Sequence, residues 1–281
     1  MTNISLTTTT LGINNLVDIP NIVKKLNAKI ELSSNCEFSP SVQNIKKFTN
    51  KLYIHNYSPK PKNPFVLNLA SKREDYFKES MKMVKRNINL SCSLRTSIYS
   101  FHAGYASDIS PEMLGKEITS DEYSSRDEIY KLFKNRCKKC SNLAKNKGVR
   151  LLVENNVLGK KNLMAGKKNL LFLSHIDEIK DFFKDMNDYC GLILDVGHLK
   201  VSANSFGFDL ESAINYLAPF TEGLHISDNS GEEDTNEYFD STFWFLPHLN
   251  LFSNLKYIAI ETKPATKDRI EYMYKLLKSN L

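Results

Sequence analysis

The sequence lacks any apolar run close to the ~18 residues that a membrane-spanning helix requires. It does not open with a charged stretch followed by an apolar one, as a secretory leader would. Cysteine is scarce and odd in number, with 5 in 281 residues, and four of these lie in or beside apolar runs or expected helices. These absences argue against a membrane protein and a disulfide framework, so we expect a cytoplasmic protein with reduced thiols.

Low-complexity tails and long Pro-, Gly- or Ser-rich linkers are also absent, and the 41% hydrophobic and 25% charged residues exclude a disordered chain. The formal net charge of +6 raises the question of nucleic acid. Lysine supplies most of the positive charge and is spread along expected helices such as Lys134–Lys147. Scattered lysines are typical of solvated surfaces, so charge alone does not favour a nucleic-acid partner.

Runs of β-forming residues recur along the chain, and each is followed by a helical pattern. Most have a continuously apolar middle, as in Gly191–Asp195 and Tyr257–Glu261, which is typical of parallel strands buried on both faces. We expect eight strands, at Ile4–Thr10, Lys29–Ser33, Leu52–Tyr57, Ile98–Gly104, Arg150–Asn155, Leu192–His198, Gly223–Asp228 and Tyr257–Thr262.

Helix signals lie between these strands. Ser39 with Pro40 is typical of a helix start, Ser174 with Asp177 resembles a capping box, and Gly148 is a candidate C-terminal cap. We expect helices over Ser125–Lys147, Phe208–Leu217 and Thr266–Leu277, besides those beginning at Ser39 and Ser174. The alternation predicts an α/β fold, a (β/α)8 TIM barrel, with residues 1–281 as a single domain. A doubly wound sheet is the alternative, but Thr7–Gly12 is not the glycine-rich turn expected there.

Acidic and histidine side chains lie at or just beyond the ends of the expected strands. The active site of such a barrel lies at the carboxyl ends of its strands, so these side chains are expected to converge. His175 and His248 lie in helical or loop segments and are expected to be bystanders. The converging set is Glu31, His55, His102, Glu154, Asp195, His198, His225, Asp228 and Glu261.

Three of these residues, Glu154, Asp195 and Glu261, are carboxylates that close apolar strands. Buried carboxylates that face one another repel strongly unless a cation neutralises them. Oxygen and imidazole ligands together suit Mn²⁺, Mg²⁺, Co²⁺ or Zn²⁺. The sequence therefore predicts a divalent metal site.

Two motifs carry a resemblance to a known family. Leu194-Asp-Val-Gly-His198 is similar to an Asp-x-x-His motif after strand six, and His225 is followed nine residues later by Asp234. With these motifs, the chain resembles the xylose isomerase-like TIM barrel superfamily over nearly its whole length. That superfamily includes sugar isomerases and epimerases, inosose dehydratases and endonuclease IV.

The resemblance implies one metal held by Glu154, Asp195, His225 and Glu261, with the two glutamates also acting as the acid/base pair. The implied function is isomerisation or epimerisation of a sugar or sugar phosphate through an enediolate, with a small carbohydrate as substrate. His198 is expected to hold a substrate oxygen or to orient Asp195. Weaker candidates for substrate binding are Glu31, Asp228, Asn236, Trp244 and Lys263. The resemblance is compatible with a homo-oligomer.

Endonuclease IV is the first alternative, as a phosphodiesterase acting at abasic sites in DNA. His55, His102, His198 and Asp234, with the four metal residues, resemble all but one position of its trinuclear site. That position should be the His of an Asp-x-His motif, and here it is Asn236, a poor zinc ligand. The first strand also lacks the expected His-x-Ser segment, so small-molecule chemistry is favoured, with a second metal near His55 and His102 left open. A third hypothesis is a carbohydrate-binding barrel without catalysis.

Two further features are weaker. Cys137 and Cys140 lie in a basic helix with no second pair, so two helix-face thiols are favoured over a metal or redox site. Lys160, Lys161, Lys167 and Lys168 lie in the loop after the fifth strand, where they either contact an anionic substrate or belong to a solvated loop.

Overall fold

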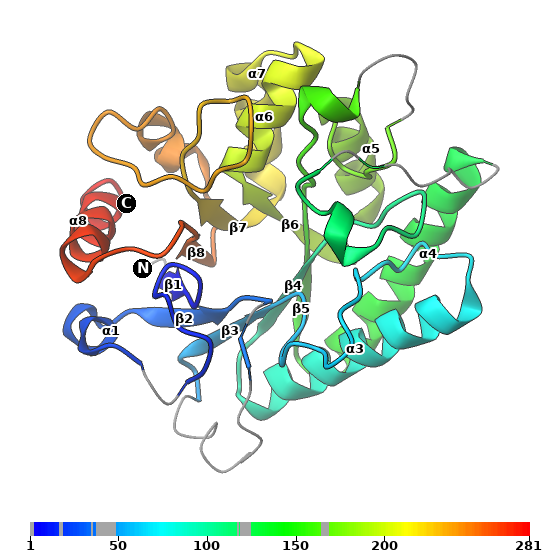
Figure 1. The fold of residues 1–281 in the computed structure, drawn as a ribbon, viewed down its shortest axis with the longest axis horizontal. Helices are drawn as coiled ribbons and strands as arrows, with labels where there is room; N and C mark the ends of the chain where they lie inside the picture. Colours follow the sequence, from blue (N-terminus) through cyan, green and yellow to red (C-terminus); the bar gives the residue numbers. More distant parts are fainter. Residues whose placement is uncertain are drawn as a thin grey trace.

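The computed structural model describes residues 3–16, 19–34, 36–37, 49–116, 118, 125–163 and 169–281. Eight parallel strands form a closed barrel in the order β1 to β8, and β8 pairs with β1 (Figure 1). The fold is therefore the predicted (β/α)8 TIM barrel. The strands are β1 (Asn3–Thr7), β2 (Lys29–Leu32), β3 (Leu52–His55), β4 (Ile98–His102), β5 (Arg150–Glu154), β6 (Cys190–Asp195), β7 (Thr221–Ile226) and β8 (Tyr257–Ile260).

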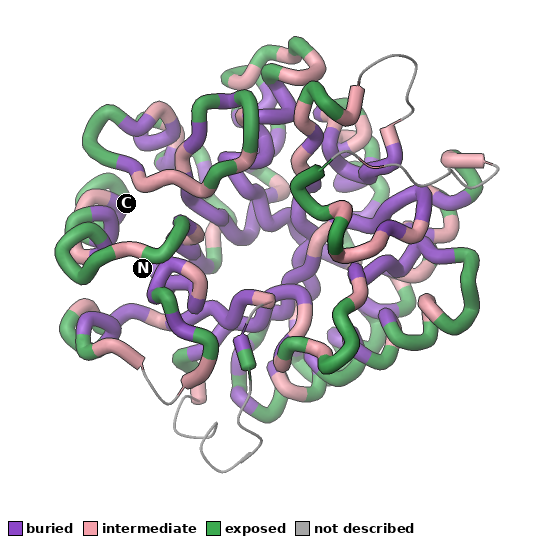
Figure 2. The backbone as a smooth tube through the Cα atoms, viewed as in Figure 1, coloured by how far each residue is buried: buried purple, intermediate pink, exposed green. Residues whose placement is uncertain are grey.

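Helices surround the barrel, and their inner faces are buried whereas their outer faces are exposed (Figure 2). Among the described residues they are α1 (Asn21–Leu26), α3 (Glu74–Ser93), α4 (Arg126–Lys145), α5 (Ile176–Met186), α6 (Val196–Phe206), α7 (Leu210–Leu217) and α8 (Lys267–Ser279). Short 3-10 helices lie in the connections, at Pro111–Met113, Lys160–Asn162, Ala218–Phe220 and Leu246–Leu251.

The helix boundaries differ from the sequence predictions in several places. Helix α5 begins after His175, whose Nδ1 accepts a hydrogen bond from the Asp177 backbone N–H at 3.2 Å, so the prediction of a Ser174 cap was wrong. Helices α1, α3 and α6 were not among the predicted helices. The expected helix start at Ser39 lies outside the described residues.

The barrel interior is layered, and this layering positions the polar side chains. One interior cluster consists of Tyr53, Ile98, Leu152, Ile193, Tyr257 and Ala259, with the Tyr53 and Tyr257 rings stacked at 4.3 Å between centroids. Successive side chains of a strand point to opposite faces, so residues two positions further along also face inward. His55, Glu154 and Asp195 follow Tyr53, Leu152 and Ile193 in this way. The apolar layer thus closes the barrel below a polar layer at the carboxyl ends of the strands.

The structure describes all five cysteines of the chain. All five cysteines are free, and Cys137 and Cys140 are buried on α4, where burial raises the pKa of Cys140 to about 12. They are helix-face thiols, as predicted. No helix in the described part of the chain is both long and apolar enough to span a bilayer.

Candidate metal centre

Four side chains from adjacent strands meet at the carboxyl end of the barrel. Three of them are on β5, β6 and β7, and the fourth is on the residue just after β8. Each side chain offers one ligand atom, and these four atoms lie within 4.8 Å of one another. This four-ligand group is Glu154, Asp195, His225 and Glu261. His225 Nδ1 lies 2.6 Å from Glu261 Oε2 and 3.3 Å from Glu154 Oε1.

Two further histidines extend the group around Glu154. His55 Nε2 lies 3.2 Å from Glu154 Oε2, and His102 Nδ1 lies 3.6 Å from the same oxygen. Together these three residues form a second set of potential ligands within 4.8 Å of one another, and Glu154 belongs to both sets. The structure thus offers a second set of oxygen and nitrogen ligand atoms beside the four-ligand group.

His198 connects this region to the loop after β7. Its Nδ1 donates a hydrogen bond to the Asn155 backbone oxygen at 2.9 Å, which leaves Nε2 3.2 Å from Asp234 Oδ2. Because β6 ends at Asp195 and α6 begins at once, His198 lies in the first turn of that helix. The structure therefore brings nine residues together, here called the barrel-mouth cluster: Glu31, His55, His102, Glu154, Asp195, His198, His225, Asp234 and Glu261.

Burial and the neighbouring charges shift the pKa values in the cluster strongly. Burial favours the neutral form of Glu154, but His102, His225 and His55 outweigh it and hold its pKa well below the usual range. Burial likewise opposes the charged form of Glu261, yet His225 lowers its pKa to about 2. The pKa of His225 is well above its usual value because Glu261, Glu31 and Glu154 outweigh burial. Burial, with the charge of Asp234, raises the pKa of Asp195 to about 7.

Several buried polar atoms of the cluster accept or donate no hydrogen bond within the described part of the chain. Buried polar atoms without partners are costly, and carboxylate oxygens and imidazole nitrogens are ligands for divalent cations. These residues therefore fit an oxygen- and nitrogen-coordinated divalent cation. The atoms are both oxygens of Glu31, Glu154 Oε2, His102 Nδ1, His225 Nε2 and Asp234 Oδ1.

Three polar residues that the sequence analysis did not identify hold the cluster in place. The side-chain amide of Asn155 accepts from the Asp195 N–H at 2.8 Å and donates to the Asp195 carbonyl at 3.1 Å. Asn56 Nδ2 lies 2.8 Å from His55 Nε2, and Ser100 Oγ lies 3.0 Å from His55 Nδ1. The two asparagines directly follow Glu154 and His55 in the sequence. This adjacency to a candidate ligand is the feature by which the sequence could have identified them.

A cavity of about 510 Å³ adjoins the cluster on the side of β3 to β6. His102, His198 and Asp234 line it together with apolar side chains of the connecting loops. Lys160 lies 3.6 Å from Glu232, and Lys161 pairs with Glu233, so two of its lining lysines pair with acidic lining residues. The apolar wall includes Tyr57, Val66, Leu67, Tyr105, Ile109 and Leu171.

Four other candidates do not line this cavity or join the cluster. Asp228 pairs with Lys200 at 2.8 Å, and Lys263 pairs with Glu237. The Asn236 amide oxygen accepts a hydrogen bond from Ser227 Oγ at 3.2 Å, and Trp244 packs against Phe243 and Phe245.

Two histidines lie away from the cluster, where they were expected. His175 caps α5, and His248 lies in the 3-10 helix Leu246–Leu251. Lys167 and Lys168 lie outside the described residues.

Solved structures of low sequence identity share this fold. A D-tagatose 3-epimerase-like protein superposes with a TM-score of 0.71 at 15% identity, covering 99% of this chain and 96% of that one. The 3-keto-D-glucoside 4-epimerase of E. coli gives 0.66 at 14%, covering 100% and 99%. The IOLI protein, solved with a zinc atom, gives 0.66 at 12%, covering 99% and 96%. At these identities the likeness shows the fold alone.

Comparison with curated protein sequences yields no match. The model of the xylose isomerase-like TIM barrel family, in contrast, matches residues 37–275, most of the chain. The predicted resemblance is thus confirmed, and the chain belongs to the xylose isomerase-like TIM barrel family.

Proposed function

We propose that this protein is a divalent-metal-dependent isomerase or epimerase that acts on a sugar. The observation that carries the proposal is the four-ligand group, in which Glu154 and Glu261 approach the same nitrogen of His225 beside Asp195. Sugar epimerases among the structures with this fold are consistent with it.

Glu154, Asp195, His225 and Glu261 would hold the cation. When bound, a divalent cation polarises neighbouring oxygens of a sugar and so acidifies the adjacent carbon-bound proton. Glu154 Oε2 accepts no hydrogen bond within the described part of the chain, which supports this assignment, since a cation would supply the interaction that this atom lacks.

Glu154 and Glu261 are the acid/base pair in this proposal. One carboxylate removes the proton from the sugar carbon, and the other returns a proton to the opposite face. The pKa of each is lowered, so both are ionised near neutral pH. The carboxylate that acts as base is thus ready to accept a proton, and the other returns one only after it has taken up a proton from solvent. His198, fixed through Nδ1 by the Asn155 carbonyl, would hold a substrate oxygen through Nε2 at the cavity wall.

The charges of the cavity favour an uncharged sugar over a sugar phosphate. Lys160 and Lys161 are two of the three lysines that line the cavity in the described part of the chain, and both pair with glutamates across it. A phosphate would have to displace those pairs. The apolar wall and the neutralised lysines therefore support a neutral carbohydrate as the substrate.

Abasic-site cleavage is less well supported. At the position where an endonuclease IV-like third metal would require an imidazole, Asn236 presents an amide oxygen that Ser227 already engages. The third metal of such a site would therefore lack a ligand.

Exchange of a carbon-bound sugar proton with solvent deuterium tests the proposal. We expect chelator-treated protein reloaded with Mn²⁺ or Co²⁺ to exchange that proton in one of a panel of ketoses. Glu154→Gln and Glu261→Gln should each reduce the rate by about 10² to 10⁴, because each removes a proton-transferring group. NMR or mass spectrometry measures the exchange, and metal content is measured in parallel.

Asp228→Asn is the matched control, since Asp228 also follows a strand but pairs with Lys200 outside the cluster. It should retain exchange. The acid/base assignment is wrong if both glutamine variants exchange at the wild-type rate, and the absence of exchange in wild-type protein across the panel would count against the isomerase itself.

A further inference from the structure

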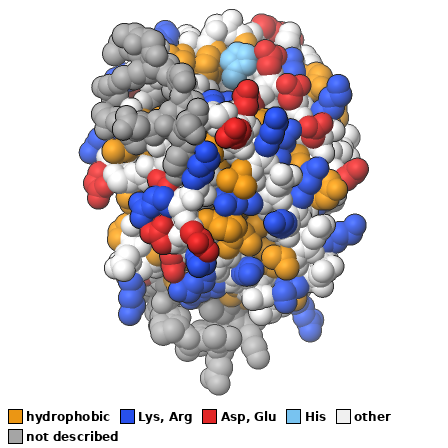
Figure 3. Space-filling view, turned by 90° about the vertical axis from the view of Figure 1, so that its right-hand side faces the viewer, with side chains coloured by type: hydrophobic (Ala, Val, Ile, Leu, Met, Phe, Trp, Pro, Cys, Tyr) orange, Lys and Arg blue, Asp and Glu red, His pale blue; other side chains and the backbone are white. Residues whose placement is uncertain are grey.

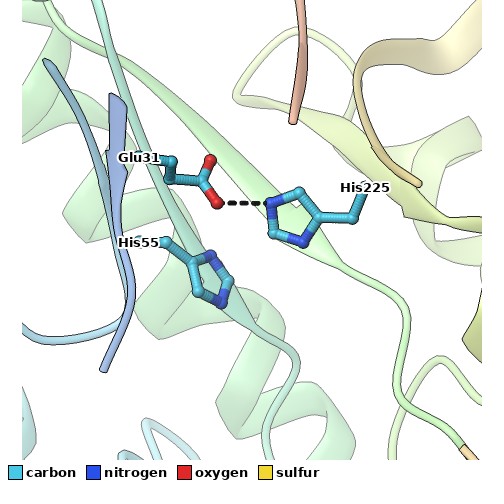
Figure 4. Close-up of side chains that lie close together, drawn as sticks. All are labelled: Glu31, His55 and His225. Carbon is cyan, nitrogen blue, oxygen red and sulfur yellow. Dashed lines mark ion pairs between the residues drawn. The ribbon is translucent and has the colours of Figure 1, made fainter. Parts of the chain in front are cut away.

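Glu31 is a buried carboxylate at the carboxyl end of β2 that lies outside the four-ligand group. Its side chain is 0% exposed, and neither oxygen accepts a hydrogen bond of acceptable geometry within the described part of the chain. One oxygen, Oε1, lies 2.9 Å from His225 Nε2 (Figure 4). A charged group in such surroundings is costly unless this contact compensates for it.

The two nitrogens of the His225 ring face different partners. Nδ1 faces Glu261 and Glu154 of the four-ligand group. Nε2 faces Glu31 on the other side of the ring, as Figure 4 shows. A histidine that ligates a metal binds it through one unprotonated nitrogen and carries a hydrogen on the other. A carboxylate that accepts that hydrogen fixes the tautomer and the ring orientation.

We infer that Glu31 is a positioning residue that accepts the Nε2–H of His225 and thereby reserves Nδ1 for a divalent cation. The inference rests on the metal site of the proposed function. Glu31 itself does not touch the cation or the substrate in this arrangement, which differs from the substrate contact expected from the sequence.

A direct ligand role is the competing possibility, because Glu31, His55 and His225 also offer three ligand atoms within 4.8 Å of one another. The nitrogens of His55 are already engaged, Nδ1 by Ser100 Oγ at 3.0 Å and Nε2 by Asn56 Nδ2 at 2.8 Å. A metal there would also require His225 to turn its unprotonated nitrogen away from Glu154 and Glu261. The positioning role requires neither change, only the alignment of the existing 2.9 Å contact into a hydrogen bond.

Titration of metal-free protein with Co²⁺ separates these roles. For Glu31→Gln we expect an unchanged number of Co²⁺ ions per chain and a Kd raised about 10- to 100-fold, because the charge that orients and polarises His225 is lost. In Zn²⁺-loaded protein, ¹⁵N NMR should show His225 protonated at Nε2 in the wild type, with a changed Nε2–H signal in the variant.

Glu222→Gln is the matched control, because it removes a mostly buried glutamate that pairs with Arg150 and Lys256 rather than with His225. Its Co²⁺ affinity should equal that of the wild type. An unchanged Kd in Glu31→Gln overturns the inference but leaves the proposed function intact, and so does the loss of one Co²⁺ per chain, which would make Glu31 a ligand. Wild-type protein that binds no Co²⁺ contradicts both.

Discussion

Individual buried carboxylates of this barrel are compensated in two different ways. Glu222, the second residue of β7, pairs with Arg150, whose Nη2 lies 2.6 Å from Oε1, and with Lys256. Among the described residues, the ion pairs of Glu154 and Glu31 are formed with histidines. Lysine and arginine are permanent partners near neutral pH, whereas imidazole can exchange its proton for a metal. The residue type of the partner thus separates a structural carboxylate from one that belongs to the candidate metal centre.

Glu222 should make the folding stability depend on acid pH. Burial opposes its charged form, but hydrogen bonds from Arg150 and Lys256 outweigh it and lower its pKa from 4.5. A lowered folded-state pKa contributes stability above the unfolded pKa, and this contribution is lost as the pH falls through the folded value. We expect Glu222→Gln to lower the free energy of unfolding by about 1–3 kcal/mol at pH 7.

Urea unfolding of both proteins from pH 7 down to pH 3 measures this effect. The difference between wild type and variant should shrink below about pH 4, since the wild-type carboxylate becomes protonated there. A difference that stays constant over this range would show that packing, rather than charge, explains the loss.

At the scale of the strand, the alternation of side chains links core packing to the site. On β7, Gly223 and His225 both face inward, so the residue two positions before a candidate ligand determines the packing below it. A Cβ at Gly223 would lie 2.8 Å from Tyr257 Cε1 and 3.2 Å from Leu152 Cδ1. The absence of a side chain at Gly223 therefore leaves room for the Tyr257 ring in the apolar layer.

We expect Gly223→Ala to destabilise the protein by about 1–3 kcal/mol, because added volume in a packed core forces neighbours out of place. Thermal and urea unfolding measure the loss. Combining it with Tyr257→Leu, which removes the ring, should make the added methyl group less costly than it is in the wild-type background. An alanine variant as stable as the wild type would mean that the ring moves aside freely.

At the scale of the whole molecule, the closed barrel brings together charges that are far apart in the sequence. The net charge of +6 does not describe the site. Lys and Arg side chains are spread over the face seen in Figure 3, with acidic side chains between them, while the barrel-mouth cluster gathers buried carboxylates. Folding therefore costs electrostatic free energy at the cluster that a bound cation would offset.

Divalent metal should accordingly raise the thermal stability of the whole protein. A cation present at 100 times its Kd stabilises the folded state by about 2.7 kcal/mol, which should raise the Tm by several degrees. Differential scanning calorimetry of chelator-treated protein, before and after addition of Mn²⁺, Co²⁺, Zn²⁺ or Mg²⁺, measures the shift.

A double variant, Glu154→Gln with Asp195→Asn, serves as the control and should show no shift, because it retains only two of the four ligands. If none of the four metals shifts the Tm of the wild type, the cluster does not bind a divalent cation with useful affinity.

The sequence by itself determined the barrel, because eight apolar strands alternating with helices have few other ways to bury both faces of a sheet. It also indicated the nine polar side chains at the strand ends, since a carboxylate or histidine that ends an apolar strand can be recognised locally. The choice of Glu154, Asp195, His225 and Glu261 among them came from the family resemblance. A local sequence pattern does not decide where a helix starts. Whether Ser174 or His175 caps α5 depends on the backbone geometry of a single turn.

Only the tertiary structure decided which of these residues face one another. The contact of Glu31 with His225, the support of Asp195 by Asn155 and the pairing of Asp228 with Lys200 join residues that are 28 to 194 positions apart. Such contacts depend on strand register and side-chain direction, which no local pattern encodes. The physical reason is that closure of the barrel places strand ends that are far apart in the sequence next to one another. The chemistry of the site depends on the resulting distances between their side chains.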